Sequence, residues 1–289
     1  MGGTKVAFRL ETEGLPPYQA AFPWPAAASL SADLAALARE VGALGGHDHG
    51  HGPIEAVGVA MPATVDRSGR VTTWPNRPYW TGLDLGAALR ELFPGAEARW
   101  ADDGDLAALA EARLAGCRDV VYLGVGTGIG GGVVLDGRLL PGIGRGSCEI
   151  GHLVVDRSGA VCACGRRGCV QAVASGPATL RRAAELRGAP VEFAELATAF
   201  AAGDGWATAA VEESCDALAA AAVGVSELTS PELVLVGGGF AHGLPGFTDL
   251  VAERVRRIGR PGGPAVTVRA AALDGLSSLH GAVLLARGA

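Results

Sequence analysis

The chain contains 289 residues, and at about 150 residues per domain this length predicts two domains. Hydrophobic residues make up 49% of the chain and charged residues 19%, which supplies large apolar cores and excludes a disordered protein. The net charge of −6 argues against a surface that binds nucleic acid or an anionic membrane. No run of about 18 apolar residues is present and no apolar segment follows residues 1–5, so neither a transmembrane helix nor a signal peptide is predicted.

Strands and helices are predicted to alternate along the first half of the chain. Ser31 is the expected N-cap of the first helix, whose last apolar position is Leu44. The histidine-rich segment His47–His51 is predicted to be a solvated loop rather than a metal site, and residues 66–69 a turn between short strands. The predicted strands are residues 4–10, 54–60, 98–101 and 120–125, and the later helices are residues 82–93 and 103–115.

The second half continues this alternation and begins with a hairpin. Asp136-Gly137 lies between two apolar runs, which is a strong signal for a two-residue hairpin turn. Strands alternating with helices predict an α/β architecture. The expected helices are near residues 177–187, 192–202, 206–228, 246–259 and 277–287, and the expected strands are residues 232–236 and 265–270.

Three of the six cysteines crowd into one short segment, Cys162-Ala-Cys164-Gly-Arg-Arg-Gly-Cys169. Cys162 and Cys164 are too close to bridge easily, but both can point at one ion around a glycine-rich turn. The nearest upstream histidine is His152, so a Cys3His structural zinc site is predicted; the alternative is three reduced thiols in a loop. The other cysteines have apolar or small neighbours and are predicted to be packing residues: Cys117, Cys148 and Cys215.

Three glycine clusters follow or border predicted strands: Gly2-Gly3, residues 126–132 and residues 237–239. Main-chain amides without side chains can approach a phosphate closely, so three such clusters favour a nucleotide site, whereas one alone would indicate a tight turn. The chain has no Walker motif. Residues 126–131 match G-x-G-x-x-G, but a hairpin follows where a dinucleotide fold requires a helix, so dinucleotide binding is not expected.

Seven segments carry the motifs of one family in that family's order. They are Gly2-Gly-Thr-Lys5, Asn76 with Trp80, Asp102-Asp103, residues 123–132, Glu149-Ile-Gly-His152, the C-x-C-G-x-x-G-C segment and residues 236–239. The E-x-G-H motif and the cysteine motif at this spacing are a very specific combination. On these residues the chain resembles the ROK (repressor, open reading frame, kinase) family of sugar kinases over nearly its whole length. Within that family, the motifs of this chain resemble most those of glucokinases and of the kanosamine or other amino-hexose kinases of antibiotic pathways.

The resemblance implies an actin-like ATPase (ribonuclease H-like) fold with two α/β domains and an interdomain cleft. The expected domains are a small one at residues 1–101, completed by a C-terminal helix at residues 275–289, and a large one at residues 102–274 with the zinc loop. In such a kinase a sugar hydroxyl attacks the γ-phosphate of ATP, a carboxylate accepts the proton, and Mg²⁺ and loop amides hold the charge. The implied partners are a small-molecule sugar and ATP, with no nucleic acid or membrane, in a cytoplasmic homodimer.

The resemblance also implies a role for each matching residue. Asp103 matches the catalytic carboxylate, at the start of a helix whose dipole favours the ionised form. His152 would bind zinc through one ring nitrogen and a sugar hydroxyl through the other. The implied sugar-binding residues are Asn76, Asp102, Glu149, His152 and Gln171. The implied ATP-binding residues are Gly3, Thr4, Lys5, Gly126, Thr127, Gly128, Gly238 and Gly239, and the zinc ligands are His152, Cys162, Cys164 and Cys169.

Three positions depart from the family pattern. Asp102 replaces an Asn that contacts hydroxyls near C3 and C4 of a hexose, and a carboxylate there suits an amine at C3, as in kanosamine (3-amino-3-deoxyglucose). Gln171 replaces a Glu that accepts hydrogen bonds from hydroxyls at C1 or C2, and its amide can also donate. Ala63 replaces a common glycine. We therefore expect phosphorylation of the 6-hydroxyl of an amino-hexose, with glucose or a C7 cyclitol as alternative substrates.

The family's first loop has an Asp that helps to position Mg²⁺, and in this chain that position would precede Met1. A catalytically inactive sugar sensor is therefore an alternative to a kinase. We hypothesise that Met1 is a valine encoded by GTG and read as a start codon, with the Asp encoded upstream. A DNA-binding regulator is not expected, because no helix-turn-helix precedes Gly2 and the charge is acidic.

Overall fold

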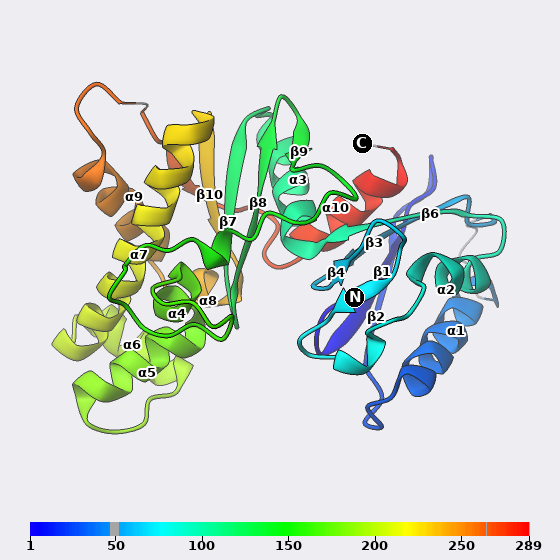
Figure 1. The fold of residues 1–289 in the computed structure, drawn as a ribbon, viewed down its shortest axis with the longest axis horizontal. Helices are drawn as coiled ribbons and strands as arrows, with labels where there is room; N and C mark the ends of the chain where they lie inside the picture. The colour runs from blue at the N-terminus through cyan, green and yellow to red at the C-terminus, as the bar shows by residue number, and fades with distance from the viewer. Residues whose placement is uncertain (47–51, 264, 289) are drawn as a thin grey trace. The chain divides into compact units, whose positions relative to one another are not determined.

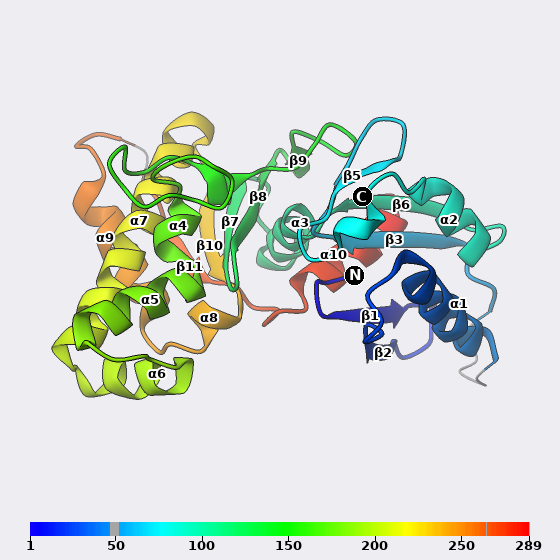
Figure 2. The ribbon, with the colours of Figure 1, turned by 60° about the horizontal axis from the view of Figure 1, so that its bottom comes forward.

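The computed structural model describes residues 1–46, 52–263 and 265–288 (Figures 1 and 2). It divides into two compact units. Unit 1 comprises Met1–Ala110, Pro141–Ser147 and Ser277–Ala289, and unit 2 comprises Glu111–Leu140 and Cys148–Leu276. The domain limits that we expect from the sequence stay a prediction. The predicted loop at His47–His51 lies outside the described residues.

Unit 1 is a mixed α/β unit with three pairs of strands. β1 pairs antiparallel with β2, β4 pairs antiparallel with β5, and β3 pairs parallel with β6 in a β-α-β arrangement through α2. The elements are β1 (Lys5–Leu10), β2 (Tyr18–Pro23), α1 (Leu30–Gly46), β3 (Ala56–Met61), β4 (Thr64–Val65), β5 (Val71–Thr73), the 3-10 helix η1 (Pro78–Trp80), α2 (Leu85–Leu92), β6 (Glu97–Asp102), the start of α3 (Asp103–Ala115) and α10 (Ser277–Ala286).

The last helix of the chain packs on the first part of it. α10, at the red end of the ribbon in Figures 1 and 2, lies against β3 and β6. A side chain at Gly58 of β3 would overlap the main chain at Ala282 of α10, so this glycine allows the helix to lie directly on the strand. The core of unit 1 is aromatic and aliphatic, and its indole rings Trp24, Trp74 and Trp80 contact one another.

Unit 2 is built on a five-stranded sheet in the order β11-β10-β7-β8-β9. β10 pairs parallel with β7 and β11, whereas β8 pairs antiparallel with β7 and β9. The elements are β7 (Val120–Val125), β8 (Ile129–Leu135), β9 (Arg138–Leu140), the 3-10 helix η2 (Ile150–His152), α4 (Val170–Ala174), α5 (Gly176–Arg187), α6 (Phe193–Ala202), α7 (Gly205–Thr229), β10 (Leu233–Gly237), α8 (Gly239–His242), α9 (Phe247–Ile258) and β11 (Val268–Ala270).

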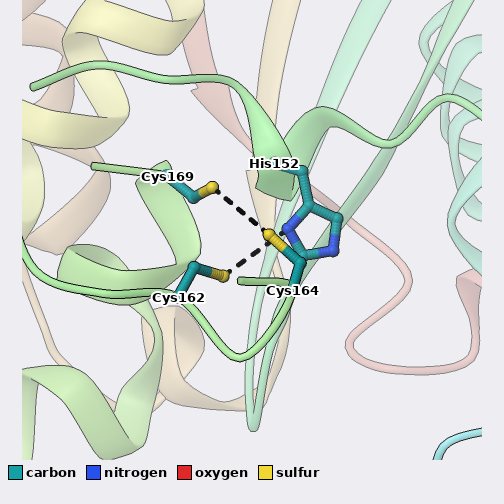
Figure 3. A group of neighbouring side chains, drawn as sticks. All are labelled: His152, Cys162, Cys164 and Cys169. Atoms are coloured by element: carbon teal, nitrogen blue, oxygen red, sulfur yellow. Dashed lines mark hydrogen bonds between the residues drawn. The ribbon is translucent and has the colours of Figure 1, made fainter. Parts of the chain in front are cut away.

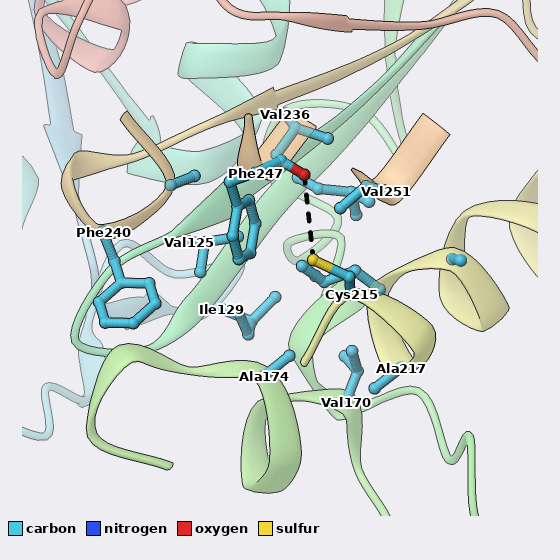
Figure 4. Close-up of a cluster of buried hydrophobic side chains, with 14 of the residues drawn as sticks. Val125, Ile129, Val170, Ala174, Cys215, Ala217, Val236, Phe240, Phe247 and Val251 are labelled. Atoms are coloured by element: carbon cyan, nitrogen blue, oxygen red, sulfur yellow. Dashed lines mark hydrogen bonds between the residues drawn. The ribbon is translucent and has the colours of Figure 1, made fainter. Parts of the chain in front are cut away.

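The alanine-rich helix α7 organises the core of unit 2. Its buried positions are mostly alanine, so α4, α5 and α9 all pack against it. Figure 4 shows the part of this core that lies beneath the ends of β7 and β10, where Cys215 of α7 faces the carbonyl of Phe247 at 3.9 Å. Burial raises the pKa of the Cys215 thiol, so this cysteine is an apolar packing residue.

Most predicted elements are confirmed within a few residues, and β7 is confirmed at both ends. The predicted hairpin is confirmed, because Asp136 and Gly137 both adopt positive φ between β8 and β9. The predicted N-cap is wrong: α1 begins at Leu30, and the Ser29 hydroxyl accepts from the Ala32 amide at 3.2 Å. The predicted packing role holds for Cys215, which is in the core of unit 2, and for Cys148, which packs against that core; Cys117 is half-buried like Cys148 but does not pack against it. Among the described residues, five elements were not predicted: β2, η1, η2, α4 and α8.

Among the described residues, no helix has the length and apolar character needed to cross a bilayer.

Candidate active site and zinc centre

The first glycine cluster lies against the segment that carries Asn76. The Gly2 amide donates to the Lys5 carbonyl at 2.9 Å, which closes a tight turn before β1. A side chain at Gly3 would overlap the amide nitrogen of Asn76, so the side chain of Asn76 lies directly against the glycine cluster. Thr4, Lys5 and Asn76 are exposed. The loop expected to bind ATP and the asparagine expected to bind sugar are therefore neighbours within unit 1.

A buried ion pair holds the Asn76 segment. Asp33 of α1 and Arg77 pair at 2.6 Å, with side-chain exposures of 0% and 8%. The same carboxylate oxygen accepts from the Trp80 indole at 2.8 Å and from the Tyr79 hydroxyl at 3.1 Å. One buried carboxylate thus binds three side chains of the segment that follows Asn76, those of Arg77, Tyr79 and Trp80.

The same guanidinium group connects this segment to the first glycine cluster. Arg77 lies over the Trp24 ring at 4.2 Å from its centroid, and the Trp24 indole donates to the Gly2 carbonyl at 2.8 Å. Sequence reasoning missed Asp33 and Arg77. The available signal was Asp33 itself, which falls on the apolar face of α1 between Leu30 and Leu37.

Asp102 and Asp103 stand where β6 ends and α3 begins. One oxygen of Asp102 accepts from the amides of Gly104 at 2.9 Å and Asp105 at 3.4 Å, so Asp102 caps the helix. Asp103 is the first residue of α3, as predicted. Burial raises the pKa of the Asp103 carboxyl, and the Met1 ammonium and the Gly104 amide only partly oppose this. We expected the helix dipole to favour the ionised form, but burial is the larger effect.

The second glycine cluster forms a loop between β7 and β8. The Gly126 amide donates to the Gly128 carbonyl at 2.9 Å, and the Gly126 carbonyl accepts from the Gly176 amide of α5 at 2.8 Å. Thr127 at the tip is exposed. Gly238, in the third cluster, adopts φ of +90° and lies so close to Val125 that a side chain would overlap the main chain of β7. The second and third clusters are therefore packed together within unit 2, with Gly239 exposed beside them.

The E-x-G-H motif lies directly on the start of β8. Gly151 approaches the Ile129 carbonyl so closely that a side chain would overlap it. Ile150 is buried in the core, while Glu149 is exposed and His152 is half-buried. The two central residues of the motif, Ile150 and Gly151, therefore anchor η2 against the start of β8, and Glu149 and His152 on either side of them are more accessible.

The predicted zinc ligands come together. One ligand atom from each of His152, Cys162, Cys164 and Cys169 lies within 4.8 Å of all the others. Cys162 Sγ lies 3.7 Å from His152 Nδ1, and Cys164 Sγ lies 3.7 Å from Cys169 Sγ (Figure 3). Zinc–sulfur bonds of about 2.3 Å in a tetrahedron require ligand atoms about 3.8 Å apart, so the four residues fit a Zn²⁺ ion.

The surroundings of the thiols also suit a metal. The main-chain amide of Arg166 donates to Cys164 and lowers the pKa of its thiol to about 7, whereas burial raises the pKa of Cys169 to about 11. Nδ1 of His152 faces the cysteines, and Figure 3 shows the second ring nitrogen pointing away from them. The expectation that the two nitrogens serve different partners stays a prediction.

Gln171 makes a contact that we did not expect. Its Oε1 accepts from the Ile129 amide at 3.0 Å, at the start of β8, and its expected role in sugar binding stays a prediction. No local pattern in the sequence signals this contact between residues 42 positions apart.

Comparison with known proteins agrees with this picture. The ROK family model matches residues 1–289. The chain is 54% identical to a kanosamine kinase from Amycolatopsis mediterranei, over 99% of this chain and 94% of that protein. It is 36% identical to a glucokinase from Thermotoga maritima, over 64% of each chain.

Solved structures with the same fold include two ROK enzymes. A ROK hexokinase from Thermus thermophilus has a TM-score of 0.85 and 33% identity, covering 99% of this chain and 96% of that one. A ROK glucokinase from Streptomyces griseus, in complex with glucose and AMPPNP, has a TM-score of 0.78 and 28% identity, covering 100% and 98%. The fold is the actin-like ATPase fold predicted from the motifs, and the chain belongs to the ROK family.

Proposed function

We propose that this chain is a sugar kinase that transfers the γ-phosphoryl group of ATP to the 6-hydroxyl of kanosamine. The observation that carries the proposal is the 54% identity, over nearly the full length, to a protein named kanosamine kinase. The Asp at position 102, where the family has Asn, supports an amino-hexose as the substrate.

Asp103 is the proposed general base. It accepts the proton of the 6-hydroxyl as that oxygen bonds to the γ-phosphorus and the bond to the β–γ bridging oxygen breaks, so that ADP leaves. Its raised pKa makes it a better proton acceptor than an exposed aspartate. Amides of the glycine loops would hold the phosphates of ATP, with Lys5 as a point charge, and a bound Mg²⁺ would supply charge neutralisation at the phosphates.

Asp102 is the proposed partner of the substrate amine. Because one of its oxygens is held by the amides at the start of α3, its rotation is fixed. An Asn could keep this cap through its own side-chain oxygen and would present an NH2 group in place of the second oxygen. Asp and Asn would therefore differ here only in the second side-chain atom, an oxygen in Asp and an NH2 nitrogen in Asn. A carboxylate oxygen attracts an ammonium group, whereas the NH2 group repels it.

Glu149, His152 and Asn76 are the proposed ligands of the ring hydroxyls. The Cys3His set would hold a structural Zn²⁺ with no open coordination position, so the ion would order the segment that carries Glu149 and His152. We also propose that the protein is cytoplasmic and forms a homodimer. Light scattering on the purified protein tests the dimer.

The decisive experiment compares kcat/KM for kanosamine, glucosamine and glucose in the wild type and in Asp102→Asn. We expect the kanosamine-to-glucose ratio to fall by about tenfold or more, since a charge-assisted hydrogen bond contributes about 1.5–3 kcal/mol. Asp84→Asn is the matched control, because Asp84 caps α2 in the same manner through the Ala87 amide at 2.8 Å. An unchanged ratio in Asp102→Asn refutes the charge pairing.

The main alternative is a glucokinase, which the similarity to the Thermotoga maritima and Streptomyces griseus enzymes favours. Higher kcat/KM for glucose than for kanosamine in the wild type would support it. If the protein is a catalytically inactive sensor, it should bind sugar without releasing ADP in the presence of Mg²⁺. The same ADP-release assay with a C7 cyclitol tests the third substrate class.

A further inference from the structure

The side chains of the Cys3His cluster differ in how far solvent reaches them. Among the six cysteines, all of which the structure describes, Cys164 alone is exposed. Cys162 and Cys169 are buried, and His152 is half-buried. Because the reactivity of a cysteine toward an oxidant in solution depends on access to its sulfur, Cys164 is the cysteine of this cluster that an oxidant reaches first.

The turn that carries Cys164 leaves this side chain room to move. The Cys162 amide donates to the Arg166 carbonyl at 2.8 Å, and the Gly165 amide donates to the Cys162 carbonyl at 2.9 Å. Gly165 adopts φ of +87°, and apart from its chain neighbours no atom of the described residues lies within 4 Å of the position that a Cβ would take on it. The tip of the turn is thus unpacked, so Cys164 can shift toward a neighbouring sulfur.

Cys169 is the partner that the geometry favours. Its Sγ lies 3.7 Å from the Sγ of Cys164, as Figure 3 shows. A disulfide bond of about 2.05 Å requires these two sulfurs to approach by less than about 2 Å. The sulfur of Cys162 lies 3.7 Å from Nδ1 of His152, and a single residue separates Cys162 from Cys164, which is too short a segment for an unstrained bridge.

We propose that this cluster is also a site of reversible oxidation, in which a peroxide oxidises Cys164 and Cys169 then forms a disulfide with it. The Cys164 sulfur attacks one peroxide oxygen, the O–O bond breaks, and a sulfenic acid and water form. The Cys169 sulfur then attacks the Cys164 sulfur, and the S–O bond breaks to release a second water. Overall, two thiolates, one hydrogen peroxide and two protons from solvent give one disulfide and two water molecules. A small thiol reverses the step by taking up the oxidation as its own disulfide.

The bridge would have two consequences within unit 2. A bound zinc ion would keep only Cys162 and His152, two of its four ligands, and would be released. Cys169 is also the N-cap residue of α4, and Gln171 in the first turn of that helix accepts from the Ile129 amide at 3.0 Å. Movement of Cys169 would therefore reach the start of β8. This proposal does not depend on which sugar the protein phosphorylates.

Peptide mapping of the purified protein identifies the bridge. Trypsin cuts after Arg166 and Arg167, so Cys162 and Cys164 stay together on one peptide and Cys169 falls on another. We expect hydrogen peroxide to give a joined pair of peptides, and fragmentation of that pair should place the bridge at Cys164. The joined pair should appear with the loss of about two thiols and the release of about one zinc ion per chain. Dithiothreitol should separate the peptides again.

Hydrogen exchange measures the second consequence without any assay of activity. In the oxidised protein the Ile129 amide should exchange at least about tenfold faster than in the reduced, zinc-loaded protein. Treatment with dithiothreitol and Zn²⁺ should restore the slow rate. Protein that has been freed of metal by a chelator and kept reduced should form the same bridge faster than zinc-loaded protein, because a zinc ion occupies the sulfur lone pairs.

Two variants separate this site from general oxidation of the chain. Cys164→Asp keeps a ligand atom for zinc but has no sulfur, so peroxide should give no joined peptides and should release zinc at least about tenfold more slowly. Cys117→Ser is the matched control, because it removes a half-buried thiol outside the cluster. The joined peptides and the zinc release should be the same in Cys117→Ser as in the wild type.

A bridge that involves Cys162 overturns the proposal, as does oxidation of Cys164 that dithiothreitol does not reverse. Zinc that stays bound after both thiols are lost also overturns it, and so does a cluster that forms no bridge under conditions that oxidise free cysteine. If the protein binds no zinc, the bridge between Cys164 and Cys169 is still expected, and the same peptide mapping decides it.

Discussion

The buried carboxylate of Asp33 is the side chain of unit 1 whose removal should cost the most. Asp33→Ala leaves Arg77 charged and without its ion-pair partner at 8% side-chain exposure, and it removes the acceptor of Trp80. Breaking a buried ion pair from one side costs about 3–5 kcal/mol, and a buried donor that loses its partner costs about 1–3 kcal/mol more. We therefore expect unit 1 to lose at least about 4 kcal/mol of unfolding free energy.

Removing both charges should cost less than the two single removals added together. Arg77→Met alone leaves Asp33 with the Trp80 and Tyr79 donors, so its cost should be smaller than that of Asp33→Ala. In the double variant Asp33→Ala with Arg77→Met no unpaired charge remains, and its loss should be smaller than the sum of the two single losses by about 1–3 kcal/mol.

Tryptophan fluorescence reports this unfolding well, because unit 1 contains Trp24, Trp74, Trp80 and Trp100 and unit 2 contains Trp206. When every variant also carries Trp206→Phe, the fluorescence change during a guanidinium titration reports the unfolding of unit 1 alone. A loss below about 1 kcal/mol for Asp33→Ala, the scale of an exposed pair, would refute the reasoning.

Three further predictions concern the site itself. Because burial raises the pKa of Asp103 and the base must be ionised, a pH–rate profile should show kcat/KM falling in acid with a midpoint above the usual aspartate value of 3.8. The same shift affects the stability of the fold. The stabilisation from the protonated carboxyl is complete below that usual value and is lost as the pH rises through the raised pKa. Cys162→Ser should lower the zinc content from about one ion per chain, measured by elemental analysis, and a strong chelator should lower the unfolding midpoint of unit 2 in the wild type but much less in the variant. Gly151→Ala should destabilise unit 2 by about 2 kcal/mol in denaturant titration and raise the KM for sugar, because its new methyl group meets the Ile129 carbonyl; retention of full stability would show that η2 can move away from β8.

The elements with strong periodicity could be predicted from the sequence, and the weakly patterned ones could not. β7 is a run of buried apolar residues, and its limits are the predicted ones. β2 was missed because it ends at Pro23 and follows Pro16 and Pro17, which read as strand breakers; in the structure it pairs with β1, and Pro23 stands at its last position. α4 has five residues, too few to show a helical period.

The same distinction holds within the site. The cysteine ligands could be found because they are close in the sequence, and the glycine clusters because they adjoin strands. Contacts between distant segments could not be predicted as pairs. Asp33 on the apolar face of α1 signals a buried carboxylate, but not that its partner is Arg77, 44 positions away, and nothing signals that Gln171 reaches Ile129 across 42 positions. The sequence could suggest which side chains are chemically able to act, but not that Asp102 and Gln171 each already bind main-chain amides.

Those two contacts change how the departures from the family pattern should be understood. Each exchanged side chain holds a main-chain amide with one atom, so the exchange between acid and amide acts on the remaining atom alone. The zinc segment supports the second contact, because Cys169 is the N-cap residue of α4 and Gln171 lies in its first turn. Loss of the metal would free Cys169, loosen α4 and weaken the bond to Ile129, so zinc removal should raise the KM for ATP as well as for sugar. If the zinc ordered only the segment that carries Glu149 and His152, the KM for sugar alone would rise.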